Sequence, residues 1–413
     1  MQKKHVWPRG HWNWPISVNH KHGVRCGDMM WVGGQVNLSP EGEVLNPGNR
    51  AAQTAAVLGN IDRVLTELGG GLEDLVSLTC FYVNDGSVDE AEFLQQVADG
   101  LPDAACTAVT TVPVPYLAYD DMLVEIECIA MGAADGSDMA RQYASKTTPG
   151  LRPKKFCTAV RCGKMIFVSA QSPRDKSGAL LGGEDIMQQT GAVAANIHRA
   201  LGDFGAGFDD VVKINRWYAG GDAIEDFEPA ALAFAANFTE PGPAATGVPL
   251  PRLADPEVKI QIAIIAMLGE NGEHLPRRHV WPDSLWDWHV HLPYQHGLKC
   301  GQMIFLGGQV SINKKGEPVD PNELTPQTHQ AMAHIKTILN ALGADYDDVC
   351  KVMAVYKGDC GADALHANLP IRSSYFSNPG PATTGVPLPT LAYDGMSIEI
   401  DIYAMAEADQ DPF

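Results

Sequence analysis

The chain has 413 residues, of which 45% are hydrophobic and 19% charged, a composition that indicates several folded domains and excludes a disordered chain. Its formal net charge of −20 disfavours nucleic-acid binding, because so acidic a surface repels phosphates. No stretch reaches the roughly 18–20 consecutive apolar residues of a membrane helix, and the N-terminal residues lack the apolar segment of a signal peptide. The nine Cys show no zinc-binding spacing, so we expect a cytoplasmic protein with buried thiols and no membrane partner.

The first predicted elements belong to one small α+β unit. A Trp-rich lead-in at His5–Pro15 precedes a β-prone run at Val24–Asn37 and a turn. A helix is predicted over Asn49–Leu68, because its apolar residues recur at helical spacing and the run ends at Gly. A strand, a shorter helix and an alternating strand complete the unit: Asp74–Val83, Val88–Leu101 and Met122–Met131.

The same order of elements occurs three times. Gln35, Gln171 and Gln309 occupy one repeated position, with offsets of 136 and 138 residues, and Thr110, Thr246 and Thr384 have the same offsets. A period of this length indicates tandem domains instead of a short solenoid repeat. We predict modules over residues 1–135, 136–272 and 273–413. The helices expected in the second and third modules are Asp185–Phe204, Ile224–Asn237, Thr325–Leu342 and Ala362–Phe376.

Each module should fold as a two-layer α+β unit with both helices on one face of its sheet. The other sheet face must also be buried, which three modules achieve by packing their sheets inward around a pseudo-threefold axis. The sequence thus predicts an intramolecular pseudo-trimer, and leaves open whether such units associate further.

The lead-in distinguishes the modules. His5–Pro15 matches His279–His289 in the third module, and these two segments hold six of the eight Trp. The second module has a short linker, residues 134–150, instead. Two interpretations are open: the lead-ins are structural straps, or Trp14 and Trp288 form an aromatic wall of a ligand pocket.

Three copies of a CG-x-M-I-F-x-GGQ-like run, a VPxP turn and a VEIE-type strand resemble the Rid/YjgF superfamily, the reactive-intermediate deaminases. The resemblance covers each module nearly whole. It implies a chorismate-mutase-like fold with ligand clefts between modules. It also implies hydrolysis of an enamine or imine to a ketone and ammonia, without a cofactor or metal.

The family's site residues match this chain only in part. The family Glu corresponds to Glu125 and Glu399, but to Gln261 in the second module. The Arg that anchors the substrate carboxylate is absent, since its positions hold Val109, Ala245 and Thr383. The family's Cys position holds Thr111, Gly247 and Gly385. Its Ser position holds Gly33, Ser169 and Gly307. Its Tyr position holds His20, Phe156 and Tyr294.

Two sets of residues could supply acid or base chemistry. Glu125 and Glu399 can direct a water, and Glu127 and Asp401 share their strand faces, so a carboxylate pair could raise one pKa. The alternative is an exposed charge at a sheet edge. The second set comes just before the first strand: His20, His22, Tyr294 and His296. These could act as acid or base or be ordinary hydrogen-bonded residues, and two His are too few for a catalytic zinc.

Other positions could bind the substrate. The backbone at Gly33–Gly34–Gln35 and Gly307–Gly308–Gln309 could hold an oxyanion or only allow close packing. Arg216 could replace the missing anchor from another direction, or be a solvated charge at a strand end. Hydroxyl donors are also expected at Thr110, Thr111, Ser169, Thr246 and Thr384.

These patterns favour a Rid-type hydrolase that acts on a C–N bond of a small molecule in one or two of the three clefts. The alternative is a non-catalytic small-molecule-binding or regulatory protein, which the missing Arg supports. Because the second module has lost both the Glu and the lead-in, we expect the three clefts to be unequal.

Overall fold

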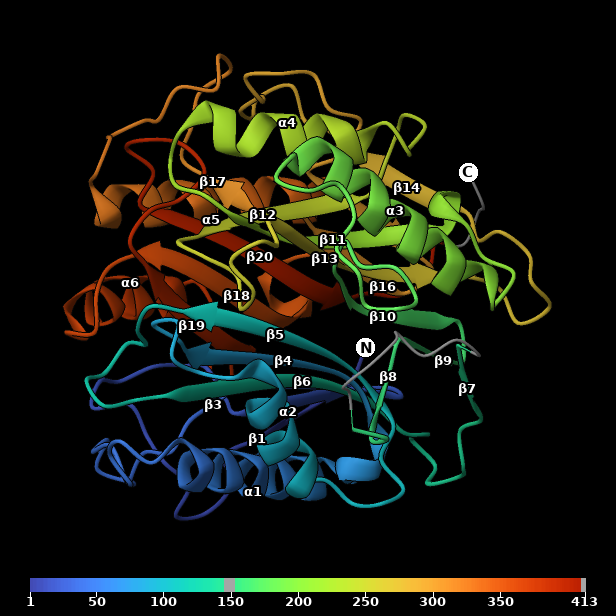
Figure 1. The fold of residues 1–413 in the computed structure, drawn as a ribbon. Helices are drawn as coiled ribbons and strands as arrows, with labels where there is room; N and C mark the ends of the chain where they lie inside the picture. Colours follow the sequence, from blue (N-terminus) through green and yellow to red (C-terminus); the bar gives the residue numbers. More distant parts are fainter. Residues whose placement is uncertain (145–152, 410–413) are drawn as a thin grey trace.

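The computed structural model describes residues 1–144 and 153–409, so that residues 145–150 of the predicted linker lie outside the described residues. Three α+β repeats follow one another along the chain (Figure 1). Among the described residues, no helix has the length and apolar character needed to cross a membrane.

The first repeat has a sheet with two helices. Its strands, in sheet order, are β1 (Lys3–Val6), β2 (Gly23–Cys26), β3 (Met29–Gln35), β6 (Val124–Met131), β4 (Leu75–Val83) and β5 (Thr107–Val114). Its helices are α1 (Arg50–Leu68) and α2 (Glu90–Asp99), which confirms the two helices predicted there. Figure 1 shows both helices on the outer side of this sheet, with the other two repeats against its opposite side.

The second and third repeats have a similar order of elements, with one additional short strand in each, β8 and β17. The second contains β7 (Arg141–Tyr143), β8 (Phe156–Cys157), β9 (Ala159–Cys162), β10 (Met165–Gln171), α3 (Ile186–Gly202), β11 (Val211–Ala219), α4 (Ile224–Ala235), β12 (Ala244–Leu250) and β13 (Ile260–Met267). The third contains β14 (Arg277–Val280), β15 (Gly297–Cys300), β16 (Met303–Leu306), β17 (Gln309–Val310), α5 (Leu324–Ala341), β18 (Val349–Lys357), α6 (Asp363–Ser374), β19 (Ala382–Leu388) and β20 (Ile398–Met405).

The first helix shows why the sequence folds as predicted. Asn49 caps α1 by accepting a hydrogen bond from the Ala52 N–H, and Gly69 ends the helix in the left-handed conformation, at φ 88°. The buried side chains of the helix recur at helical spacing and face the sheet.

The repeats contact one another in a closed sequence. β8 of the second repeat pairs in parallel with β5 of the first, and Ala244 of the second repeat bridges Gln295 of the third. Ala382 of the third repeat bridges Lys21 of the first. A shared buried cluster contains equivalent side chains of all three repeats, at the positions Cys26, Cys162, Cys300, Trp31, Phe167 and Phe305. Strand bridges and a shared buried cluster therefore connect all three repeats.

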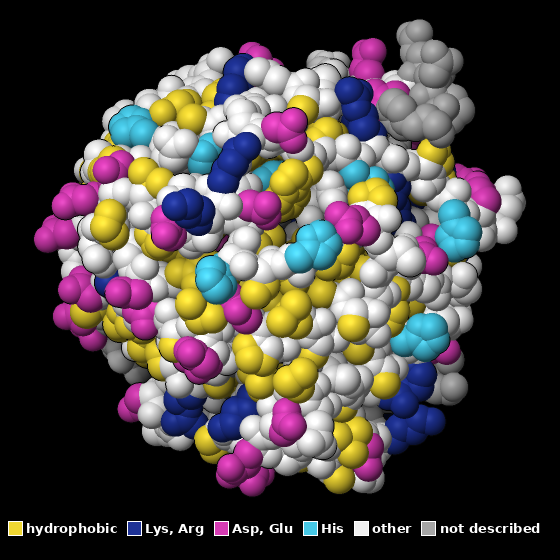
Figure 2. All heavy atoms as spheres, turned by 90° about the horizontal axis from the view of Figure 1, so that it is seen from above, with side chains coloured by type: hydrophobic (Ala, Val, Ile, Leu, Met, Phe, Trp, Pro, Cys, Tyr) yellow, Lys and Arg dark blue, Asp and Glu magenta, His cyan; other side chains and the backbone are white. Residues whose placement is uncertain are grey.

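The surface carries mixed charges. On the face seen in Figure 2, acidic, basic and hydrophobic side chains are interspersed.

Candidate functional site

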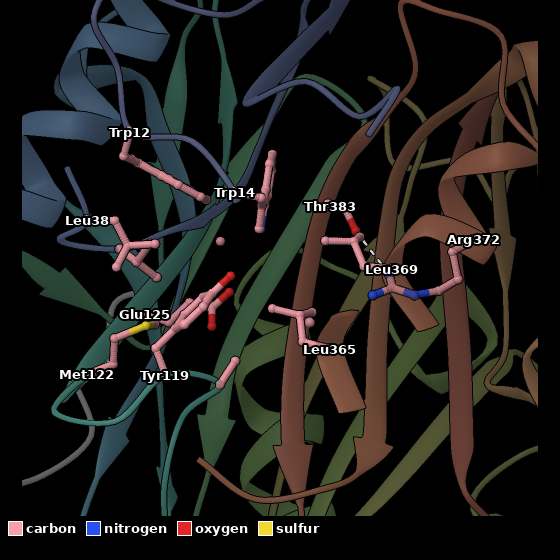
Figure 3. A pocket seen from close by; sticks show the side chains of 14 residues that line it. Trp12, Trp14, Leu38, Tyr119, Met122, Glu125, Leu365, Leu369, Arg372 and Thr383 are labelled. Atoms are coloured by element: carbon pink, nitrogen blue, oxygen red, sulfur yellow. Dashed lines mark hydrogen bonds between the residues drawn. The ribbon is translucent and has the colours of Figure 1, made fainter. Parts of the chain in front are cut away.

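A cavity lies between the first and third repeats. The first repeat contributes Trp12, Trp14, Leu38, Tyr119, Met122 and Glu125, and the third contributes Leu365, Leu369, Arg372 and Thr383. Figure 3 shows these two groups on opposite sides of the cavity. The cavity thus combines an acid from one repeat with a cation from another.

Glu125 is held in the cavity wall by the pairing of its strand. It lies on β6 opposite Phe81 of β4, and only 6% of it is exposed. Burial, and then the nearby charge of Glu127, raise the pKa of Glu125 to about 8, although a hydrogen bond from the Gly385 N–H lowers it. The side chain is therefore a protonated acid at neutral pH.

Two glycines let the chain pass close to this acid. The pairing of β3 with β6 shifts register at Gly33 and Gly34, as in a β-bulge. A Cβ on Gly34 would lie 1.8 Å from Glu125 Oε1, and one on Gly33 would lie 2.4 Å from the Thr383 carbonyl oxygen. The Gly33 N–H donates to the His22 carbonyl and the Gly34 N–H to Thr384 Oγ1. The glycines thus serve close packing, and their N–H groups are not free to hold an oxyanion.

Arg372 supplies a buried cation opposite Glu125. It lies on α6 with Leu365 and Leu369 and is fully buried. Its Nε donates to Asn368 Oδ1 at 2.8 Å and its Nη1 to Thr383 Oγ1 at 3.2 Å. Its Nη2 has no hydrogen-bond partner within the described part of the chain. Burial lowers the pKa of Arg372 to about 10, so that it remains charged at neutral pH.

Arg372 is a buried residue of the cavity that the sequence analysis missed. Its Nη1 contacts Thr383, the position at which the sequence analysis expected the family's Arg, and it does so from a helix. One signal could have pointed to it: Arg372 follows Leu365 and Leu369 at helical spacing, which places it on the buried face of α6 together with Asn368 and Ser373.

The Trp-rich lead-in both closes the fold and lines the cavity. Trp12 Nε1 donates to Gln35 Oε1 at 3.0 Å, and Trp14 stacks on His22 with ring centroids 5.4 Å apart. Trp12 and Trp14 also face the cavity (Figure 3). In the third repeat, Trp286 donates equivalently to Gln309. The two interpretations of the lead-in are thus compatible, and the Gln of the GGQ run holds the lead-in in place.

The structure places the predicted His and Tyr acids outside the cavity. His20 is buried and its Nδ1 contacts the Pro381 carbonyl, while His22 and His296 contact carbonyls of their own lead-ins. Burial lowers the pKa of His20 and of His296 to about 3 and that of His22 well below its usual range. Tyr294 is also buried, against Phe238. Burial disfavours the imidazolium form of these three His, so the lowered pKa values favour neutral imidazoles near pH 7.

The predicted Thr donors are used between repeats. Thr384 Oγ1 lies 2.8 Å from Lys351 Nζ, which pairs with Glu127 at 2.7 Å. The second and third repeats have the equivalent set, in which Thr246 Oγ1 lies 2.6 Å from Lys213 Nζ and Lys213 pairs with Asp401 at 2.9 Å. Glu127 and Asp401 are therefore members of ion pairs with buried lysines, and Glu127 itself is partly exposed. Thr110 is also occupied, since its Oγ1 accepts the Ala170 N–H.

A second acid and cation meet between the second and third repeats. Burial, and then the Asp401 charge, raise the pKa of Glu399 to about 8, while Lys213, Arg216 and a hydrogen bond from the Gly247 N–H oppose the rise. A Cβ on Gly308 would lie 1.7 Å from Glu399 Oε1, which repeats the arrangement at Gly34. Arg216 is 4% exposed, so it is a buried cation and not a solvated charge.

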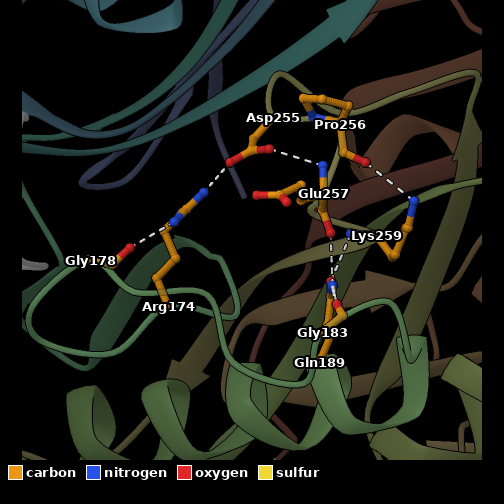
Figure 4. A network of polar contacts seen from close by, with 8 residues as sticks. All are labelled: Arg174, Gly178, Gly183, Gln189, Asp255, Pro256, Glu257 and Lys259. Atoms are coloured by element: carbon orange, nitrogen blue, oxygen red, sulfur yellow. Dashed lines mark hydrogen bonds and ion pairs between the residues drawn. The ribbon is translucent and has the colours of Figure 1, made fainter.

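The boundary between the first and second repeats has a different chemistry. Gln261 replaces the Glu and donates to the Thr111 carbonyl at 2.7 Å. Arg174 and Asp255, at the positions of Leu38 and Tyr119, form an ion pair where the first cavity has an apolar wall (Figure 4). The other predicted donors here are also bonded: Thr111 Oγ1 donates to Glu90, and Ser169 Oγ accepts from Gln171. This boundary thus lacks both the acid and the apolar wall.

Comparison with known proteins identifies the class to which this fold and site belong. The family model described as Endoribonuclease L-PSP matches residues 15–132, 151–268 and 288–406. The chain belongs to this family, within the Rid/YjgF superfamily, with three repeats in one chain.

Individual relatives are similar to single repeats. A RutC family protein of Pyrococcus horikoshii is 34% identical over 115 residues, which is 28% of this chain and 88% of the relative. The 2-iminobutanoate/2-iminopropanoate deaminase of Escherichia coli is 32% identical over 65 residues, 16% of this chain and 50% of the relative. A chorismatase structure, at 13% identity and a TM-score of 0.53, covers 80% of this chain and 93% of its own. That likeness concerns the α+β fold alone.

Proposed function

We propose that the chain hydrolyses a C=N bond of a small carboxylate-bearing imine in the cavity between the first and third repeats. The observation that carries this proposal is the joint presence of acid and cation at two boundaries. Glu125 faces Arg372 and Glu399 lies near Arg216, whereas at the boundary that has Gln261 the arginine, Arg174, is paired with Asp255. An acid and a buried cation at the same boundary are expected of two groups that serve one substrate.

The geometry supports a simple reaction. The free Nη2 of Arg372 would bind the substrate carboxylate, and the Trp12 and Trp14 rings would cover its apolar part. Glu125 would donate its proton to the imine nitrogen. A water would then add through its oxygen to the carbon to give a carbinolamine. One water proton would return to Glu125 and the other would pass to the nitrogen, so that the C–N bond breaks and ammonia leaves the ketone. The balance is imine plus water to ketone plus ammonia.

The proposal also includes how the three repeats pack together. We infer an intramolecular pseudo-trimer with the modules 1–135, 136–272 and 273–413, because the bridges between repeats close on themselves and equivalent side chains share one buried cluster. A net charge of −20 and the mixed surface in Figure 2 support a small-molecule substrate and not a nucleic acid.

The test is ammonia release from 2-iminobutanoate generated in the assay by an amino-acid oxidase. The variants Glu125→Gln and Arg372→Met should each lower the rate by about 10²-fold or more, and the exposed-residue control Glu67→Gln should match the unmodified protein. Unchanged ammonia release in Glu125→Gln would reject the acid role. An unmodified protein that binds the product 2-oxobutanoate without accelerating hydrolysis would favour a binding or regulatory protein.

A further inference from the structure

Methionines from all three repeats line a second cavity, whose volume is about 650 Å³. Seven of the 14 Met of the chain border it, and no described residue lines both this cavity and that of Glu125 and Arg372. Six of the seven occupy two repeated positions, with the offsets of 136 and 138 residues that relate the repeats: Met29, Met165 and Met303, and Met131, Met267 and Met405. Each repeat therefore contributes the same two thioethers.

The two methionines of each repeat are direct neighbours. They lie opposite each other on paired antiparallel strands: Met29 and Met131, Met165 and Met267, and Met303 and Met405. Residues in this position point to the same face of the sheet, with Cβ atoms about 4.5–5.5 Å apart. A Met side chain is unbranched and has three rotatable bonds, so its sulfur can reach a point that the sulfur of its neighbour also reaches. Each pair can thus place two thioethers on one ion.

Core packing is the alternative explanation for so many apolar side chains. The six methionines are only 4–5% exposed, and they belong to one buried cluster of all three repeats. A packed interior, however, leaves few voids larger than a water molecule, whereas these side chains border about 650 Å³ of open volume. This volume leaves space for an ion and for the side-chain rotations that would enclose it.

The donor atoms and the charges select the kind of ion. Thioether sulfur is a soft ligand, which favours Cu(I) over harder divalent ions. Across residues 1–144 and 153–409, no three His, Cys, Asp or Glu side chains form a group that could hold a metal ion. The charged residues of the cavity carry one more negative than positive charge, which favours a cation: Asp28, Glu270 and Asp409, with Lys164 and Lys299.

We propose that this cavity binds Cu(I) through its paired Met thioethers, at a site that does not depend on the imine hydrolysis proposed above. A thioether carries no proton, so the affinity should be the same at pH 6 and at pH 8. Binding through thiols would strengthen with pH, because a thiol must lose its proton to bind a metal. This distinction matters because free, buried thiols lie one strand further in each repeat, at Cys26, Cys162 and Cys300.

The experiment follows the methyl groups of methionine by NMR in the full chain labelled with 13C-methyl Met. Cys106→Ser and Cys360→Ser are introduced first, because these two thiols are the partly exposed ones. Silver nitrate supplies Ag(I), which shares the ligand preference of Cu(I) and is stable in air. The signals of the six paired methionines, assigned with single Met→Leu variants, should shift. The signal of Met187, which is 52% exposed, should not, and Zn²⁺ should shift none of them.

Titration calorimetry then compares two sets of substitutions of nearly constant volume. Met29→Leu, Met165→Leu and Met303→Leu together break every pair and should weaken Ag(I) binding by about 10²-fold. The matched control, Met30→Leu with Met332→Leu and Met396→Leu, changes three buried methionines outside the cavity and should stay within about 3-fold of the parent.

Several results would overturn the site. These are unmoved signals of the six methionines, shifts confined to Met187, and equal affinity in the two triple variants. An affinity that falls by about 10-fold or more from pH 8 to pH 6 would assign the metal to thiols instead. If a urea unfolding curve shows that the first triple variant is not folded, the NMR shifts in the parent protein decide alone. Loss of ammonia release in Glu125→Gln, with these shifts unchanged, would leave the metal site standing.

Discussion

Replacing Glu125 with Gln should stabilise the protein in a manner that depends on pH. The native state holds the Glu125 pKa at about 8, against an ordinary value of 4.5. Between these values the native state binds more protons than the unfolded state, so the contribution of this group to stability falls as pH rises. At 1.36 kcal/mol per unit, keeping the group protonated costs about 3 kcal/mol at pH 7 but only about 1 kcal/mol at pH 5. Gln does not titrate and avoids this cost.

The measurement is the free energy of unfolding in urea, followed by Trp fluorescence at both pH values. The difference between Glu125→Gln and the unmodified protein should grow by about 2 kcal/mol from pH 5 to pH 7. Changes in packing or hydrogen bonding would add the same amount to this free-energy difference at pH 5 and at pH 7. The increase from pH 5 to pH 7 therefore reports the ionisation of Glu125 alone. Glu67→Gln, on an exposed helix face, is the control and should show no growth. An equal difference at both pH values for Glu125→Gln would refute the raised pKa.

Further predictions concern the same site and the contacts between repeats. The rate of imine hydrolysis should fall as pH rises through about 8, because Glu125 then loses its proton, and a rate unchanged up to pH 9 would contradict its role as the acid. Lys351→Met should lower the free energy of unfolding by about 2–3 kcal/mol, because the partly exposed Glu127 would lose its cation, and Lys351→Met with Glu127→Leu should recover most of that loss. Failure of the second change to restore urea stability would mean that the pair is not coupled. Gly34→Ala should lower kcat by at least about 10-fold, since its Cβ would displace the Glu125 carboxyl group, and full activity would show that this close approach is dispensable. Arg372→Lys should raise KM more than it lowers kcat, because an ammonium cannot reproduce the guanidinium fork, and an unchanged KM would exclude Arg372 as the anchor.

The local sequence pattern was sufficient to predict the helices and the repeats of the fold. The helix at Arg50–Leu68 follows from apolar spacing, an Asn cap and a terminal Gly, all of which act within a few residues. The three repeats were visible in the sequence because equivalent positions recur at offsets of 136 and 138 residues. Glu125 and Glu399 could also be selected in advance, since their strand and its neighbours recur in the family pattern.

The roles of other side chains depended on contacts between distant segments. His22 is of a residue type that can act as an acid or base. The lead-in buries it among Trp rings, however, and burial disfavours its charged form near neutral pH. Thr384 has a suitable hydroxyl, but Lys351 and Glu127 occupy it across a boundary between repeats. A single sequence does not show which buried partner will meet such a group.

The sequence by itself determined that three related α+β units follow one another and that two of them retain the strand Glu, because periodicity and residue type are properties of the chain. Only the tertiary structure decided where the cation comes from. Arg372 lies 247 residues after Glu125 and reaches the cavity from a helix of another repeat. The packing of the repeats, and not the local sequence pattern, buries both groups at one boundary. This burial shifts their pKa values and leaves Nη2 of Arg372 without a partner in the described residues.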